Sequence, residues 1–282
     1  MPVELPRSVA QALATARAQG LDRLDVQLLL AHCLQRPRAW LIAHDDALLA
    51  SADAQAFMQF VERRAAGEPL AYLVGTREFH GLELQVTPDV LVPRPDTETL
   101  VDWALELLVG EATPRVIDLG TGSGAIALAI KHACPGAQVH ALDESAAALA
   151  VAQANGRRLG LDVTWHRGSW WQALPPESGR FDLVLANPPY VAAGDPHLAA
   201  LAHEPRSALV PQEAGADGLG AIAAITHGAA AWLEPGAWLL FEHGHQQAPA
   251  VRELLEQHGF AATQTRLDLA RLQRCTGARW PG

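Results

Sequence analysis

The sequence predicts an α/β protein in which a doubly wound, mostly parallel sheet follows a small N-terminal helical domain. Three observations support this prediction. From Pro114 to the end of the chain, short apolar runs alternate with helical stretches. Residues 8–74 show only helical periodicity, and between Arg77 and Val92 the apolar residues recur with a period of two. The expected parts are a helical bundle over residues 1–75, a hairpin-like connector over residues 76–93 and an α/β domain over residues 94–282.

Capping residues divide the N-terminal part into short helices. The first lies between Ser8 and Gly20, the second is capped by Asp22, and a third occupies residues 51–67. These helices carry no convergent set of acids, bases or nucleophiles. We therefore expect this part to pack or to dock a partner, and we do not expect it to catalyse a reaction.

The elements after the connector begin with a helix that runs through Leu107, for which Asp96 or Thr97 is the expected cap. Because helical stretches separate the strands that follow, their sheet is expected to be mostly parallel. These strands occupy residues 116–119, 138–142, 163–166, 183–186 and 238–241, with a last strand within residues 271–280.

Composition and charge argue against several classes of protein. A formal net charge of −10 disfavours a broad contact with nucleic acid, so no direct nucleic-acid binding is expected. Three widely spaced cysteines indicate reduced thiols in a cytoplasmic protein. The first residues, 1–7, lack the character of a signal peptide, and no stretch has the length of a membrane span. The histidines form no ligand cluster, so no metal is predicted.

A clamp for a planar nitrogen is predicted at Asn187–Tyr190, the Asn-Pro-Pro-Tyr segment that follows the apolar run Phe181–Ala186. Its prolines hold the nearby carbonyl groups rigid and outside the strand ladder, so these groups remain hydrogen-bond acceptors. Asn187 adds a side-chain acceptor and two donors, and Tyr190 adds a ring that stacks on an amide or a base. A strand-ending turn is the simpler interpretation of the same residues.

A ligand-binding turn is predicted between a buried strand and a helix that begins near Ala125. Its residues are Gly120, Thr121, Gly122, Ser123 and Gly124. The glycines allow the backbone to approach a ligand closely, and the spacing also matches a dinucleotide fingerprint. However, Asp118 before the turn repels a pyrophosphate and attracts the ammonium and sulfonium groups of S-adenosylmethionine. S-adenosylmethionine is therefore the expected cofactor, and a nicotinamide dinucleotide is the alternative.

Two further residues complete the expected cofactor site. Asp143 ends the second strand of the domain, where a carboxylate accepts hydrogen bonds from ribose hydroxyls; its other interpretation is an N-cap of the helix starting at Ser145. Trp171 follows the third strand, where its ring is expected to stack on an adenine, with core packing as the competing interpretation.

With these residues the chain resembles the PrmC/HemK-type glutamine methyltransferases, which modify peptide chain release factors. The resemblance rests on residues 25–30, 67–70, 75–79, 91–98, 120–124, 187–190, 195–197, 204–205 and 242–244. It implies a class I methyltransferase sheet of seven strands and a helical N-terminal domain. It also implies methyl transfer to the glutamine side chain of a release factor's Gly-Gly-Gln tripeptide, with S-adenosylhomocysteine as product. Cofactor contacts map onto residues 120–124, Asp143, Trp171 and Asn187.

The chain departs from the family pattern at two places. Trp170 stands where the family often has an acidic residue, which puts the hydrogen bond on the adenine side in doubt. The segment Leu269–Gln273 lacks the turn expected before the last strand, which leaves the geometry of that hairpin open.

The expected mechanism addresses the weak nucleophilicity of an amide nitrogen, whose lone pair is delocalised. The Asn187 side-chain oxygen and the Pro188 carbonyl are expected to accept the two amide hydrogens. Tyr190 is expected to stack on the amide plane, with Pro189 beside it, and Phe79 to help wall the pocket. No general base is required, because the methylated nitrogen is acidic and loses its proton afterwards.

Two other functions remain open. An adenine amino-methyltransferase acting on DNA or RNA shares the Asn-Pro-Pro-Tyr segment, but the acidic charge and the helical part disfavour it. A non-enzymatic scaffold is disfavoured because both halves of the site are present. The resulting expectation is a monomeric cytoplasmic enzyme whose protein partner is a release factor.

Overall fold

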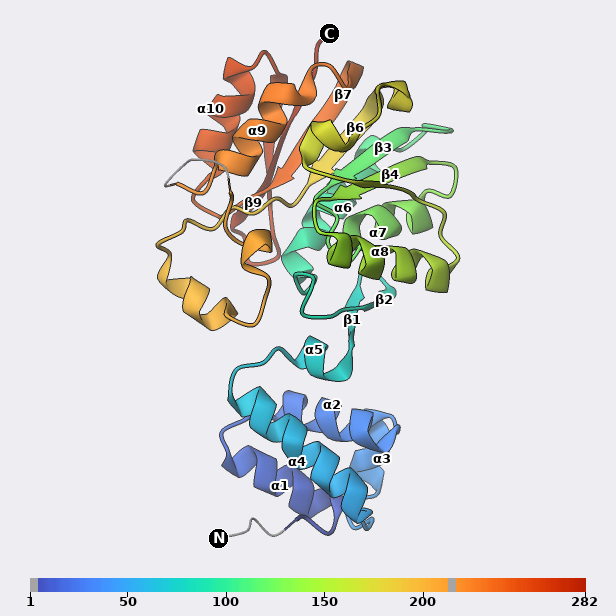
Figure 1. Cartoon of the computed structure of the whole chain (residues 1–282), viewed down its shortest axis with the longest axis vertical. Helices are drawn as coiled ribbons and strands as arrows, with labels where there is room; N and C mark the ends of the chain where they lie inside the picture. Colours follow the sequence, from blue (N-terminus) through green and yellow to red (C-terminus); the bar gives the residue numbers. More distant parts are fainter. Residues whose placement is uncertain (1–4, 213–216) are drawn as a thin grey trace. The chain divides into compact units, whose positions relative to one another are not determined.

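The computed structural model describes residues 5–212 and 217–282. Residues 1–4, which belong to the N-terminal segment 1–7 discussed above, lie outside the described residues. The chain divides into two compact units, Met1–Thr76 and Arg77–Gly282 (Figure 1). Within the described residues, every helix is too short or too polar to cross a bilayer.

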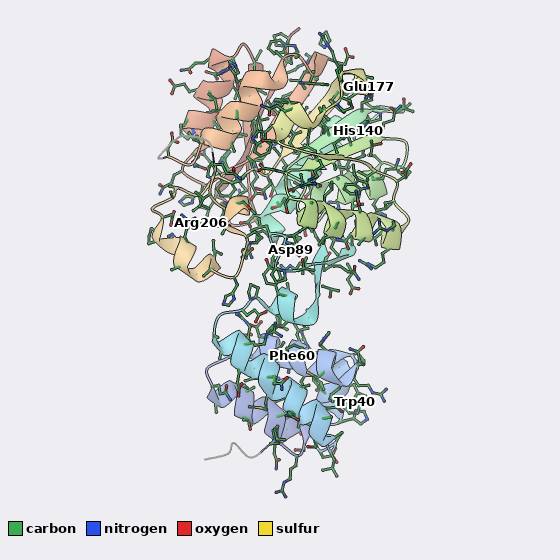
Figure 2. All side chains as sticks on the ribbon, in the orientation of Figure 1. Trp40, Phe60, Asp89, His140, Glu177 and Arg206 are labelled. Carbon is green, nitrogen blue, oxygen red and sulfur yellow. The ribbon has the colours of Figure 1, made fainter. Side chains whose placement is uncertain are left out.

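The first unit is a helical bundle. Ser8 and Asp22 cap its first two helices through their side chains, as the sequence predicts. Its core includes Leu29, Phe57 and Val61, which are fully buried, while Trp40 and Phe60 pack at the edge of this core (Figure 2). The helices are α1 (Val9–Ala18), α2 (Arg23–Leu34), α3 (Arg38–Ala43), α4 (Ser51–Ala65) and α5 (Leu70–Val74). The two short ones, α3 and α5, are not expected from the sequence because five or six residues show no helical period.

The second unit contains a seven-stranded sheet in the order β5-β4-β3-β6-β7-β9-β8. Its strands are β3 (Arg115–Leu119), β4 (Gln138–Asp143), β5 (Thr164–Arg167), β6 (Phe181–Ala186), β7 (Leu233–Glu242), β8 (Ala261–Leu267) and β9 (Gln273–Arg279). The first five are parallel, and β9 runs antiparallel to both β7 and β8. This confirms the predicted fold class. The strand β8 escapes the sequence pattern because most of its residues are exposed.

Helices cover both faces of this sheet (Figure 1). Val116 and Leu183 face one core together with α6 and α7, whereas their neighbours Ile117 and Val184 face a second core with α9 and α10. Alternate strand residues are thus buried on opposite sides, as a doubly wound sheet requires. The helices are α6 (Glu98–Leu107), α7 (Ala125–Ala133), α8 (Ala146–Leu159), α9 (Gly220–Ala229) and α10 (Ala248–Gln257).

Five short 3₁₀ helices join the described elements of the second unit. They are η1 (Pro95–Thr97), η2 (Trp170–Ala173), η3 (Pro176–Ser178), η4 (Pro196–Leu201) and η5 (Arg206–Ala208). Thr97 occupies the N-cap position of α6, as the sequence predicts, but η1 precedes the helix and the Thr97 side chain makes no capping hydrogen bond. The Thr97 hydroxyl instead accepts a hydrogen bond from Asn187 Nδ2.

The predicted hairpin forms from β1 (Thr76–Phe79) and β2 (Leu82–Gln85). Phe79 and Leu84 are buried in the same core as α6. Asn155 on α8 binds both backbone groups of Gln85, accepting from its N–H at 2.7 Å and donating to its carbonyl at 2.9 Å. The strand β2 is therefore fixed to α8.

Candidate functional site

The turn after β3 brings backbone to the carboxyl edge of the sheet. Gly120, Gly122 and Gly124 adopt positive φ angles of 77°, 56° and 85°, which other residues rarely tolerate. The N–H groups of Gly120 and Thr121 donate to the carbonyl of Leu142 at 3.0 and 2.8 Å, so the turn is tied to the end of β4. The backbone can therefore bend sharply here because glycine occupies these three positions.

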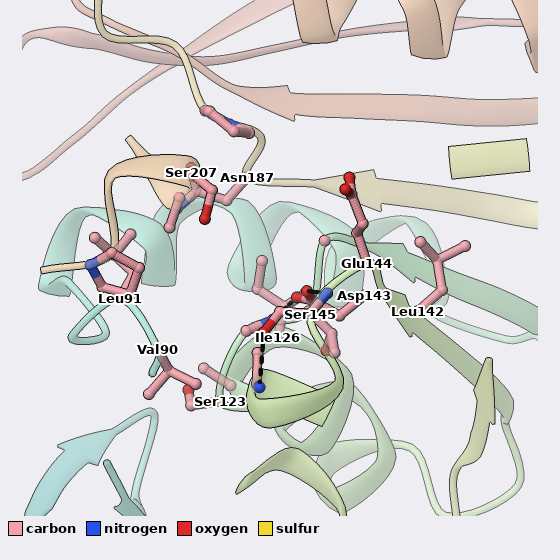
Figure 3. A pocket seen from close by; sticks show the side chains of 18 of the residues that line it. Val90, Leu91, Ser123, Ile126, Leu142, Asp143, Glu144, Ser145, Asn187 and Ser207 are labelled. Atoms are coloured by element: carbon pink, nitrogen blue, oxygen red, sulfur yellow. Dashed lines mark hydrogen bonds between the residues drawn. The ribbon is translucent and has the colours of Figure 1, made fainter. Parts of the chain in front are cut away.

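A cavity of about 420 Å³ opens beside this turn (Figure 3). Its volume lies in the range of small-molecule sites. The lining comes from six parts of the second unit: residues 89–97, the turn at 120–126, residues 142–148, residues 168–170, Asn187 with Pro189, and residues 205–212. The structure therefore brings the predicted turn, Asp143 and Asn187 to one cavity.

Asp143 is fixed in this cavity by two backbone donors. Its Oδ2 accepts from Gly122 N–H at 2.8 Å, and its Oδ1 accepts from Ser145 N–H at 2.9 Å. Burial raises the pKa of Asp143, while these two hydrogen bonds oppose the rise. The cap of α8 is Ser145, whose hydroxyl accepts from Ala148 N–H. Each Asp143 oxygen keeps a further lone pair for a ligand hydroxyl.

Asp118 and Gly124 stand behind the cavity wall and do not line it. The fully buried Asp118 accepts through Oδ2 from the Thr121 hydroxyl at 2.6 Å and from Ala127 N–H at 3.3 Å. Its Oδ1 has no partner among the described residues. Burial raises the pKa of Asp118 to about 7. Gly124 begins α7, where an added Cβ would lie 3.0 Å from the Leu128 side chain.

The aromatic residue that lines the cavity is Trp170, and its neighbour Trp171 lies in the core. Trp171 stacks on Trp232 with an interplanar angle of 8°. Trp170 adopts a positive φ of 42°, and its ring passes close to the turn, since a Cβ added to Gly120 would lie 3.4 Å from it. Trp170 is therefore the candidate for the cavity role that the sequence predicts for Trp171, because Trp170 lines the cavity and Trp171 is buried in the core.

The Asn187–Tyr190 segment leaves β6 with only part of its side chains at the cavity. Asn187 and Pro189 line it, and Asn187 Nδ2 donates to the Thr97 hydroxyl at 3.2 Å. The Tyr190 hydroxyl donates to Glu242 Oε1 at 3.1 Å. Burial and the negative charge of Glu242 raise the pKa of Tyr190. Neither Pro188 nor Tyr190 lines the cavity, and Phe79 lies in the core at 1% exposure.

Two lining segments were not assigned a role from the sequence. They are residues 89–97 and residues 205–212. Glu204, which precedes the second segment, accepts a hydrogen bond from Val92 N–H at 3.1 Å and forms an ion pair with Arg94. These contacts join the two segments. Glu204 is 7% exposed. In the sequence, Arg94 and Glu204 each stand next to prolines, which is a signal for these loops, but only the folded structure shows that the loops meet.

No group of three or more His, Cys, Asp or Glu side chains suited to a metal occurs within the part of the chain that the structure describes.

Comparison with known proteins gives matches over both units. Residues 4–75 match the family model described as the PrmC N-terminal domain, and residues 97–210 match the methyltransferase small domain. A release factor glutamine methyltransferase of Bordetella pertussis is 51% identical over 92% of this chain and 95% of its own length. One of Burkholderia pseudomallei is 48% identical over 98% of both chains.

Solved structures share the fold of the second unit at low sequence identity. The T. thermophilus 16S rRNA methyltransferase RsmC, solved with AdoMet and guanosine, is 23% identical with a TM-score of 0.54, covering 73% of this chain and 49% of its own. A methyltransferase from Pyrococcus furiosus is 15% identical with a TM-score of 0.52, covering 71% and 89%. At these identities the likeness concerns the fold alone.

Proposed function

The chain belongs to the release factor glutamine methyltransferase family, and we propose from this that it methylates a peptide chain release factor. The methyl group comes from S-adenosylmethionine and goes to the side-chain amide nitrogen of the glutamine in the Gly-Gly-Gln tripeptide. The match of both units to the family's domains supports this function for the whole chain.

The residues around the cavity fit S-adenosylmethionine, which supplies an electrophilic methyl group on a sulfonium when bound. The turn presents backbone without side chains, and Asp143 offers two held carboxylate oxygens to ribose hydroxyls. Asp118 lies behind the cavity wall, and its buried Oδ1, which has no hydrogen-bond partner among the described residues, is an acceptor whose negative charge above its pKa of about 7 favours a cationic ligand. Trp170 provides a ring for a flat base. A dinucleotide fits less well, because the Asp118 charge would repel its pyrophosphate.

The single observation that carries the chemistry is the orientation of Asn187. Its Nδ2 is engaged with Thr97, which leaves Oδ1 as the free acceptor at the cavity. In our proposal this oxygen and the carbonyl of Pro188, which does not itself line the cavity but stands between the lining residues Asn187 and Pro189, accept the two hydrogens of the substrate amide and hold its nitrogen for transfer. The same acceptors favour the positive charge that develops on the nitrogen, so no general base is needed before the proton leaves.

The remaining parts of the proposal concern partners and location. We assign the helical first unit to substrate docking, because it matches the family's N-terminal domain and carries no catalytic group of its own. The acidic chain is proposed to act as a cytoplasmic monomer without direct contact to nucleic acid. Family membership also disfavours an adenine methyltransferase, the alternative that shares the Asn-Pro-Pro-Tyr segment.

Methyl transfer to defined acceptors tests the function. The purified chain is incubated with labelled S-adenosylmethionine and a release factor, the same factor with alanine in place of the tripeptide glutamine, or adenine-containing DNA and RNA. Label should enter only the intact release factor. Label in nucleic acid, or equal label in the alanine version, would overturn the proposal.

A further inference from the structure

Two hydrogen bonds connect the Asn187–Tyr190 segment to buried residues behind it. Asn187 Nδ2 donates to Thr97 Oγ1 at 3.2 Å, and the Tyr190 hydroxyl donates to Glu242 Oε1 at 3.1 Å. Thr97 is 4% exposed and Glu242 is 1% exposed. Both ends of the segment are therefore held by side chains that solvent does not reach.

The sheet register explains why Glu242 stands beside the segment. The strands β6 and β7 are parallel neighbours, and Ala186 pairs with Phe241. Asn187 directly follows Ala186, and Glu242 directly follows Phe241, so the Glu242 carboxylate lies at the level where the Asn187–Tyr190 segment begins. The buried carboxylate is thus placed by the fold itself.

The two oxygens of the Glu242 carboxylate differ in their partners. Oε1 accepts from Tyr190, whereas Oε2 is buried without a well-formed hydrogen bond among the described residues, although the Thr97 hydroxyl lies near the carboxylate. Burial raises the pKa of Glu242, while the Thr97 and Tyr190 hydroxyls and the positive charge of Arg274 favour its charged form. Leaving a buried carboxylate oxygen without a donor costs free energy. The orientation in which the neighbouring Thr97 hydroxyl points its proton at Glu242 removes this cost and is therefore favoured.

With Glu242 in its charged form, the hydroxyl and amide protons of Thr97 and Asn187 have one possible arrangement. A carboxylate only accepts, and a threonine hydroxyl has a single proton to donate. If Thr97 directs that proton to Glu242, its oxygen faces Asn187 only with lone pairs. Asn187 must then present Nδ2 to Thr97 and Oδ1 to the cavity. The reverse orientation would set the Asn187 oxygen against the Thr97 oxygen and aim the Asn187 NH2 group at the substrate NH2 group, donor against donor.

We propose that Thr97 and Glu242 are positioning residues, which set the polarity of the Asn187 amide and keep its oxygen facing the methyl acceptor. Glu242 also holds Tyr190, so one carboxylate fixes both ends of the segment. This inference rests on the proposed function for its consequence in catalysis. Its structural content, the orientation of Asn187, is independent of the substrate.

A substrate-free experiment tests the orientation directly. The chain contains two asparagines, Asn155 and Asn187, so selective ¹⁵N-asparagine labelling gives two side-chain amide signals. Thr97→Val removes the hydroxyl while keeping the shape, and should speed proton exchange of the Asn187 NH2 group by roughly tenfold or more. Asn155, which donates to the carbonyls of Gln85 and Ser123, serves as the internal control for intact folding.

Two variants separate the hydrogen bond from general disturbance. Thr97→Ser keeps the hydroxyl and should retain the slow exchange of Asn187. Thr99→Val makes the same chemical change two residues along, outside the cavity lining, and should leave both amide signals as they are. Unchanged Asn187 exchange in Thr97→Val, with the Asn155 signal intact, would overturn the inference.

Kinetics with a release factor then test the role in catalysis. Thr97→Val and Glu242→Gln should each lower kcat by about 10- to 100-fold with little change in KM, and Thr97→Ser should restore most of the rate. Because both act through Asn187, the double variant should be no slower than the slower single variant. Additive losses, or equal kcat for Thr97→Val and Thr97→Ser, would refute the positioning role. An inactive wild-type chain would instead contradict the proposed function, while the amide exchange would still decide the orientation.

Discussion

The indole N–H of Trp171 donates a hydrogen bond to the Ile225 carbonyl of α9 at 2.7 Å. This bond, with the stacking on Trp232, uses the polar atom of the ring inside the core. Two adjacent tryptophans thus have separate surroundings, one at the cavity and one between the sheet and α9.

Substitutions at these two tryptophans should change different properties, cofactor binding for Trp170 and stability for Trp171. Trp170→Ala should weaken S-adenosylmethionine binding by roughly tenfold, because a stacking surface is lost. Trp171→Phe should leave the Kd within about threefold but lower the free energy of unfolding by about 1–2 kcal/mol, since the Ile225 carbonyl loses its donor. Titration calorimetry and urea unfolding measure the two quantities. The reverse pattern would return the adenine contact to Trp171.

Gly228 on α9 should resist substitution although alanine favours helices. A Cβ added there would lie 2.2 Å from Cδ1 of Trp171, a distance that forces the ring or the helix to move. Gly228→Ala should therefore destabilise the protein by about 1–3 kcal/mol in urea unfolding. Gly194→Ala is the matched control, because nothing lies within 4 Å of its added Cβ, and its effect should stay within about 0.5 kcal/mol.

Asp143 and Asn187 should separate cofactor binding from turnover. Asp143→Ala should raise the Kd for S-adenosylmethionine by about 10- to 100-fold, since hydrogen bonds to a charged group and the anchor of Gly122 are both lost. Asn187→Ala should abolish methyl transfer while leaving cofactor binding largely intact. Calorimetry and single-turnover labelling distinguish these results, and unchanged turnover in Asn187→Ala would refute the clamp assignment.

Asp118 should make the protein less stable as the pH rises. Burial raises its pKa from an ordinary value near 3.8 to about 7 in the folded chain. Between these values the folded state holds a proton that the unfolded state has lost, so the contribution of this group to the free energy of unfolding falls with increasing pH. Asp118→Asn removes this dependence.

Urea unfolding at pH 4 and pH 8 checks the sign. Relative to wild type, Asp118→Asn should gain about 1–3 kcal/mol of stability between the two pH values. The same variant should bind S-adenosylmethionine more weakly, because the negative charge behind the turn is gone. A difference in stability that is equal at both pH values would show that the pKa of Asp118 is not raised in the folded chain.

The first unit should contribute to the protein substrate and not to the cofactor. Deleting residues 1–74 leaves the second unit with its own cores and the whole cavity lining. The KM for the release factor should rise, while the Kd for S-adenosylmethionine should stay the same. An unchanged KM would remove the docking role that we propose for the helical unit.

Local sequence signals located most elements of the second unit. The strands β3 and β6 are recognisable in the sequence because they are buried on both faces and therefore consist mostly of apolar residues. The strand β8 is not, because it lies at the edge of the sheet and most of its side chains meet solvent. The glycines of the 120–124 turn are also recognisable in the sequence, since few residues other than glycine adopt the positive φ angles found there.

The sequence by itself determined the fold class, the glycine turn of residues 120–124 and the strand-ending segment Asn187–Tyr190, because each depends on residues close together in the chain. Only the tertiary structure decided which tryptophan faces the cavity, since the positive φ of Trp170 has no periodic signature in the sequence. It also decided that Thr97, Asn187 and Glu242 meet. These residues come from three separate elements, and parallel pairing of β6 with β7 together with the packing of η1 brings them within reach of one another.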